Sequence, residues 1–271
     1  MKVLLTNDDG IQATGLNELR RALLDVPGVD LAVIAPNSNR SATARSITTR
    51  RPLEVEEVQF DDGTVGYACD GTPVDCVRLA SLGLTGDGPG LIVSGINHGS
   101  NLGDDITYSG TVAAAHEGIV LGVPGIAVSQ QSQAREMDFR LGLEFDFTTA
   151  AAFAARIVEE IEEVPLPAGT LLNINVPHGE IVGVDVARLG KRAYRDELSL
   201  MRQEESGRRL YRIYGPAPDT AGDDGTDLNA VGAGRIAVTP LHFDLTDEPG
   251  IDTLRSYDLA RLLAPAAEEV E

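Results

Sequence analysis

Short apolar runs and amphipathic segments alternate along residues 1–180. Residues 3–5 and 30–35 read as buried strands, and turn-forming residues follow each of them. Between these runs, leucine recurs at helical spacing from Thr14 onwards, which predicts a helix that Thr14 caps. A strand, a helix and a second strand form a βαβ unit, so we expect parallel strands joined by a right-handed crossover.

The same alternation continues towards the middle of the chain. We predict further strands over 91–94, 125–128 and 171–176, and helices over 73–82, 111–121 and 148–164. This order favours an α/β fold: an open, mostly parallel, Rossmann-like sheet with helices on both faces, in three layers.

The pattern changes after Val176. Short β-like runs at 181–186, 211–214 and 235–239 are separated by turns rich in Gly and Asp, and a final helix is expected over 251–263. We interpret this part as a β-rich arm rather than as more of the sheet. The expected division is an α/β core over 1–180 and a C-terminal arm and helix over 181–271, within one structural unit. Because the arm has few long apolar runs, we expect it to pack against another subunit in a homodimer or homotetramer.

The charge of the chain narrows its possible partners. It has 42 acidic and 22 basic residues, a net charge of −20, and two lysines, Lys2 and Lys191. Such a surface repels nucleic-acid polymers and anionic membranes. The acid excess and the loss of lysine together favour a halophilic source. No apolar run is long enough for a membrane span or a signal peptide, so we expect a cytoplasmic protein with Cys69 and Cys76 as free thiols.

Three polar clusters follow apolar strands, where open α/β sheets bind ligands. They cover residues 7–10, 37–41 and 95–105. In the first, Asp8 and Asp9 either end a strand and stabilise a turn, or hold a hard divalent cation that offsets their mutual repulsion.

The segment Ser109-Gly110-Thr111 precedes a helix rich in small residues. Ser or Thr there is an ordinary helix cap, and the same helix N-terminus can bind a phosphate through its amides and hydroxyls. The two interpretations are compatible.

Other nucleotide and phosphate sites do not match the spacing. The chain has no GxxxxGK[ST] and no GxGxxG, and Gly10 replaces the second acid of the Asp-x-Asp typical of haloacid-dehalogenase phosphatases. A response-regulator receiver lacks the second half of this chain. The four histidines form no metal-binding pattern, and His98, next to the third cluster, is the one to test.

Six segments together resemble the SurE family of stationary-phase survival proteins, which are metal-dependent 5′-nucleotidases. They are LLTNDDG (4–10), APNSNRSA (35–42), GTPVDCV (71–77), VSGINHGSNLGDDITYSGTVAAAHEG (93–118), LNINVP (172–177) and TPLHFDLT (239–246). The resemblance implies an α/β/α sandwich with an arm that pairs subunits. It also implies one divalent metal, Mg²⁺ or Mn²⁺, bound by Asp8, Asp9, Ser41 and Asn97, and a phosphate site at Asn101 and Ser109-Gly110-Thr111.

These features predict hydrolysis of nucleoside monophosphates to nucleoside and phosphate, with Asp8 and Asp9 as catalytic metal ligands. The resemblance also implies 3′-nucleotides and short polyphosphate as further substrates. Either a water or a carboxylate such as Asp8 is the nucleophile. The competing hypothesis is a non-catalytic nucleotide-binding protein of stress assemblies, which would not need two metal carboxylates.

Overall fold

The computed structural model describes residues 1–133, 144–191, 198–213 and 223–263. Its strands are β1 (Lys2–Thr6), β2 (Asp30–Pro36), β3 (Val55–Gln59), β4 (Val65–Cys69), β5 (Leu91–His98), β6 (Gly125–Gln130), β7 (Thr170–Val176), β8 (Gly183–Val186), β9 (Ser199–Gln203), β10 (Arg209–Arg212) and β11 (Arg235–His242). Its α-helices are α1 (Thr14–Leu24), α2 (Pro73–Ser81), α3 (Gly110–Val120), α4 (Thr148–Glu159), α5 (Asp227–Gly232) and α6 (Glu248–Arg255). Two 3-10 helices cover Gly103–Thr107 and Leu259–Leu263.

One nine-stranded sheet forms the centre, in the order β3-β4-β2-β1-β5-β6-β7-β11-β8. The neighbours are parallel except for the antiparallel pairs β3–β4 and β7–β11. The chain builds outwards from β1 in both directions, through β2 and β4 on one side and through β5, β6 and β7 on the other. The carboxyl ends of β1 and β5 therefore meet at the topological switch point, where such sheets bind ligands.

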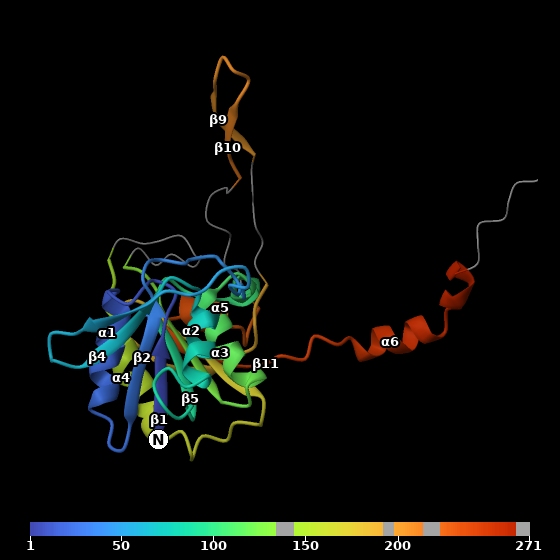
Figure 1. The fold of residues 1–271 in the computed structure, drawn as a ribbon. Coiled ribbons are helices and arrows are strands. Elements are labelled where there is room, and N and C mark those ends of the chain that lie inside the picture. Colours follow the sequence, from blue (N-terminus) through green and yellow to red (C-terminus); the bar gives the residue numbers. More distant parts are fainter. Residues whose placement is uncertain (134–143, 192–197, 214–222, 264–271) are drawn as a thin grey trace, which may run out of the picture.

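Alternating side chains of the strands cover the two faces of the sheet. In β1, Val3 and Leu5 pack in one apolar cluster with α1 and α4, whereas Leu4 packs in another with α2. Figure 1 shows the helices on both sides of the sheet. The predicted α/β fold with helices on both faces is confirmed.

Several predicted boundaries are wrong for local reasons. Ala13, not Thr14, is the N-cap of α1, and no side chain caps this helix. The predicted helix over 148–164 ends at Glu159. Strand β5 continues to His98, so Asn97 lies within the strand and not in a loop behind it.

The description of residues 181–240 as an arm outside the sheet is wrong for two strands. β11 pairs with β7, and β8 pairs with β11, so both complete the main sheet. Four observed elements were not expected from the sequence: β3, β4, β9 and α5. Of the predicted run 211–214, Arg212 ends β10, and Tyr214 lies outside the described residues.

Two segments leave the sandwich. The β9–β10 hairpin forms a separate two-stranded sheet, and the segment carrying α6 runs away from the body (Figure 1). Neither β9, β10 nor α6 contains a buried residue. Among the described helices, none is both long and apolar enough to cross a membrane.

Candidate active site at the carboxyl ends of β1 and β5

The turn after β1 places two neighbouring aspartates at the carboxyl edge of the sheet. Asn7 closes this turn, because its Oδ1 accepts from the Gly10 N–H at 3.1 Å and its Nδ2 donates to the Gly10 carbonyl at 3.0 Å. Gly10 has a φ of 107°, which favours glycine. Asp8 is 3% exposed and Asp9 is half-buried. The turn therefore places one carboxylate in a buried position and the other in a half-buried position.

Burial changes the acid–base behaviour of both carboxyl groups. Loss of solvation, and then the charge of Asp9, raise the pKa of Asp8 to about 6, although the Thr111 hydroxyl donates a hydrogen bond to it at 2.6 Å. Burial also raises the pKa of Asp9 to about 6, against a 3.0 Å hydrogen bond from the His98 backbone N–H. No ion pair among the described residues includes either aspartate. Their charge is thus not offset by a basic side chain there.

The loop after β2 closes one side of the aspartate pair. The Arg40 N–H donates to the Asp8 carbonyl at 2.6 Å, and Asn39 Nδ2 donates to Asp9 Oδ1 at 3.2 Å. Asn39 Oδ1 in turn accepts from the Ser41 N–H at 2.8 Å. These bonds bring Ser41, far from Asp8 in sequence, to the rim of the same site.

Strand β5 delivers Asn97 from the other side. The register of β5 against β6 shifts between Ser94 and Asn97. Such an irregularity re-aims side chains at the end of a strand. Asn97 Nδ2 donates to the Gly99 carbonyl at 2.8 Å, which leaves the amide oxygen as the group suited to bind a cation.

His98 belongs to an aromatic cluster beside the site. Its ring stacks on Phe145 and Phe147, with ring centroids 5.2 and 4.9 Å away. Its Nε2 accepts from the Gly15 N–H at 3.3 Å, and burial lowers its pKa. A ring whose Nε2 accepts a hydrogen bond is neutral, with its proton on Nδ1.

The N-terminus of α3 lies against Asp8. Ser109 is the N-cap, and its Oγ accepts from the Val112 N–H at 3.1 Å, which confirms the predicted cap. A Cβ on Gly110 would lie 2.8 Å from Asp8 Cβ and Oδ2. Only glycine therefore lets this helix approach so closely. The Thr111 hydroxyl donates its hydrogen bond to Asp8. The backbone N–H of Thr111 is therefore the group of this residue that can bind an anion.

A small hollow of about 20 Å³ joins these elements. Five of the predicted residues line it: Asp8, Ser41, Asn97, Asn101 and Ser109. His98 lines it too, and so do Ala42, Asp105 and Tyr108. The sequence analysis did not name these last three as site residues, although they lie in the quoted segments 35–42 and 93–118. The volume suits an ion or a water molecule, so a nucleotide would lie over the rim, where Tyr108 is 54% exposed.

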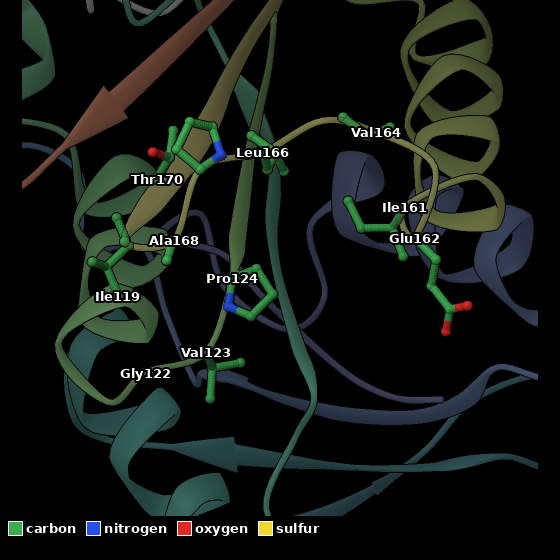
Figure 2. Close-up of a pocket in the computed structure, with 12 residues that line it drawn as sticks. Ile119, Gly122, Val123, Pro124, Ile161, Glu162, Val164, Leu166, Ala168 and Thr170 are labelled. Carbon is green, nitrogen blue, oxygen red and sulfur yellow. The ribbon is translucent and has the colours of Figure 1, made fainter.

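A larger cavity of about 500 Å³ opens at the opposite edge of the sheet (Figure 2). Its lining residues lie between Ile119, near the end of α3, and Pro124, just before β6, and between Ile161, after α4, and Thr170, the first residue of β7. Most of its lining is apolar, and it contains none of the predicted site residues. Size alone therefore does not locate the chemistry of this molecule.

Only two of the four predicted metal ligands at the switch point, Asp8 and Asp9, are charged side chains. In the described ranges, no group of three or more His, Cys, Asp or Glu side chains is placed to hold a metal ion. The predicted ligands are instead two carboxylates, one hydroxyl and one amide oxygen. All four are oxygen donors, which Mg²⁺ and Mn²⁺ prefer.

Comparisons with known proteins identify the family of this chain. The family model described as "Survival protein SurE" matches residues 3–196. The 5′-nucleotidase SurE of Rubrobacter xylanophilus is 50% identical over 268 residues, which cover 97% of this chain and 99% of that protein. The 5′-nucleotidase SurE of Herpetosiphon aurantiacus is 48% identical over 91% of this chain and 94% of its own length.

A solved structure extends the similarity to three dimensions. The crystal structure of the SurE protein from Aquifex aeolicus matches with a TM-score of 0.78 and 37% sequence identity, covering 94% of this chain and 99% of that one. The chain therefore belongs to the SurE family.

Proposed function

We propose that this chain is a 5′-nucleotidase, a phosphoric monoester hydrolase that converts nucleoside monophosphates to nucleoside and phosphate. Relatives that carry the name 5′-nucleotidase SurE are 42–50% identical to it over nearly the full length. The observation that carries the proposal is the pair of the buried Asp8 and the half-buried Asp9 at the switch point, next to the N-terminus of α3.

We further propose that Asp8, Asp9, Ser41 and Asn97 hold one Mg²⁺ or Mn²⁺. The fit rests on the two carboxyl groups whose pKa burial raises, because a divalent charge would make their ionised form favourable in this position. When bound, such a cation polarises a phosphoryl oxygen and lowers the pKa of a bound water.

The phosphate itself is proposed to bind at the N-terminus of α3, next to Asp8. The first amides of α3, at Gly110 and Thr111, have no partner within the helix and carry its positive end. The Ser109 hydroxyl retains its proton for donation, because its oxygen accepts the cap bond. With the side chain of Asn101, these donors would stabilise the charge that develops on the phosphoryl oxygens.

Assembly, location and substrate range are further proposals. The β9–β10 hairpin and the segment after β11 expose many apolar side chains, so we propose a homodimer or homotetramer in which they are covered. The charge of −20 supports a halophilic source and no binding to nucleic-acid polymers or membranes. A cytoplasmic location is proposed as well. Nucleoside 3′-monophosphates and short polyphosphate are proposed as secondary substrates.

A panel assay tests the function. The purified chain is incubated with nucleoside 5′- and 3′-monophosphates and polyphosphate, with Mg²⁺, Mn²⁺ or chelator, and released phosphate is measured. We expect metal-dependent release that is fastest from 5′-monophosphates. Tight nucleotide binding without phosphate release under every metal would instead support the non-catalytic nucleotide-binding alternative.

A further inference from the structure

Two asparagines inside β7 hold the backbone of Asn101 from both sides. The Asn101 N–H donates to Asn175 Oδ1 at 2.8 Å. Its carbonyl accepts from Asn175 Nδ2 at 2.9 Å and from Asn173 Nδ2 at 3.0 Å. Both backbone polar groups of one loop residue are therefore satisfied by side chains of a strand about 70 positions away.

The position of these asparagines in the sheet is unusual. β7 lies between β6 and β11, and Asn173 and Asn175 are completely buried. They are two residues apart, so they share one face of the strand, opposite Leu172 and Ile174 of the apolar core. An amide buried in a sheet is unfavourable unless it is hydrogen-bonded. Within the described chain, every side-chain hydrogen bond of these two amides goes to Asn101, and only Asn173 Oδ1 has no partner. The two amides therefore act on Asn101.

Asn101 needs such support because no regular element holds it. It lies between the end of β5 and the 3-10 helix Gly103–Thr107. Its own Nδ2 donates to Ser129 Oγ at 2.8 Å, and Ser129 of β6 is the register partner of Asn175. The strands thus fix both the backbone and the side-chain direction of Asn101, and it lines the hollow beside Asp8.

We infer that Asn173 and Asn175 are positioning residues of the phosphate site, which act through Asn101. This inference rests on the proposed phosphate-binding role of Asn101. Among the described residues, the side chains of these asparagines make no hydrogen bond to Asp8, Asp9, Ser41 or Asn97. Their loss should therefore weaken phosphate binding and leave cation binding intact.

The test compares four single variants: Asn101→Ala, Asn173→Leu, Asn175→Leu and, as control, Thr239→Val. Thr239 is a buried polar residue of β11 and the register partner of Asn173, and its hydroxyl has no hydrogen-bond partner in the described chain. The measurements are the inhibition constant of inorganic phosphate, KM and kcat for a nucleoside 5′-monophosphate, Mn²⁺ affinity by calorimetry, and the thermal midpoint.

We expect Asn175→Leu to raise the phosphate inhibition constant about 10-fold, since small displacements of positioned groups are costly. Asn173→Leu removes one of the two donors to the Asn101 carbonyl, so its effect should be smaller. It also serves as the second test if Asn175→Leu does not fold. Mn²⁺ affinity should change less than about twofold in both, and Thr239→Val should leave every functional value unchanged.

A double variant separates positioning from stability. In an Asn101→Ala background, Asn175→Leu should raise the phosphate inhibition constant less than about twofold further, because the group it positions is gone. Full additivity, or equal losses of phosphate and Mn²⁺ binding, would overturn the inference. If Asn101→Ala itself leaves phosphate binding and turnover unchanged, the assignment of Asn101 is wrong. That outcome differs from failure of the nucleotidase proposal, which would be absence of turnover in the unaltered chain.

Discussion

At the scale of single residues, the site concentrates negative charge in a place with little water. Asp8 and Asp9 each have a pKa raised from 3.8 to about 6 by burial. Between about pH 4 and pH 6 the folded chain thus binds more protons than the unfolded one. Its stability without metal should fall as pH rises through that window and stay lowered above it. A bound cation would remove this loss by favouring the ionised carboxylates.

Asp9→Asn and Asp8→Asn each test this balance. Each should lower kcat/KM by more than the ~10–100-fold typical for loss of a residue that only supports a metal ligand. Without metal, Asp9→Asn should raise the thermal midpoint at pH 7 and leave it nearly unchanged at pH 4, where the native carboxyl is already protonated. Asp87→Asn, in an exposed loop, is the matched control. Near wild-type turnover in both site variants would show that the site is assigned wrongly.

Gly110→Ala tests the close approach of α3 to Asp8. The added methyl group would lie 2.8 Å from Asp8 Cβ, so either the helix or the aspartate must shift. We expect at least about a tenfold loss of kcat/KM, because a displacement of about 1 Å at a reacting centre is costly. Gly232→Ala is the control, since nothing lies within 4 Å of a Cβ there. Equal activity of the two variants would contradict the proposed role of the α3 N-terminus.

At the scale of elements, the parallel core was predictable because its strands are continuous apolar runs. Residues 3–5, 125–128 and 171–176 each lie within an observed strand. The exact end of β5 was not predictable, because Gly95 and Asn97 resemble loop residues, and the strand continues through the pairing of Asn97 and His98 with β6. The place of β11 was also predicted wrongly from the sequence, because this strand joins the main sheet through its pairing with β7, a contact between segments far apart in the chain.

Some features of the site were likewise predictable from the sequence, and others were not. Paired acids after β1 were visible in the sequence, and so was the cap of α3. The contacts of Asn173 and Asn175 with Asn101 depend on tertiary structure that periodicity does not encode. One signal was present: two amides at alternate positions of an otherwise apolar strand, in the run LNINV. Polar residues in a buried strand need partners, so this pattern could have pointed to a polar contact but not to which one.

The segment containing α6 provides a prediction about assembly. Leu254, Tyr257 and Leu262 are 57, 47 and 66% exposed. Apolar side chains that gather on one exposed segment are typical of an interaction surface. We expect Leu254→Asp to shift the molar mass measured by light scattering towards the monomer. The control Thr253→Asp adds the same charge at an exposed neighbouring position and should not. A monomer in the unaltered protein at micromolar concentration would contradict the assembly proposal.

At the scale of the whole molecule, the main feature is the large negative net charge. The chain has 42 acidic and 22 basic residues, a net charge of −20 over 271 residues, and folding brings the carboxylates close together. Some acids are paired locally: the buried Glu117, for example, contacts both Arg45 and Arg78. Most of the excess acidic residues cannot pair with a basic residue, because the acidic residues outnumber the basic ones. Self-repulsion of this kind destabilises the compact state and depends on ionic strength.

We therefore predict that the protein requires salt. The screening length is ~30 Å at 0.01 M and ~3 Å at 1 M, so added salt converts repulsion across the whole surface into repulsion between near neighbours only. The thermal midpoint should rise steeply and monotonically from about 0.1 to about 3 M KCl, where screening is the stabilising factor. Sucrose stabilises by exclusion from the surface without screening, so it should produce a smaller rise at equal osmolality. Divalent metal at low salt should recover part of the loss, because it would neutralise the crowded pair Asp8 and Asp9. A midpoint that does not change across the KCl series would refute the halophilic interpretation. A rise that sucrose reproduces in full would refute electrostatic repulsion as its cause.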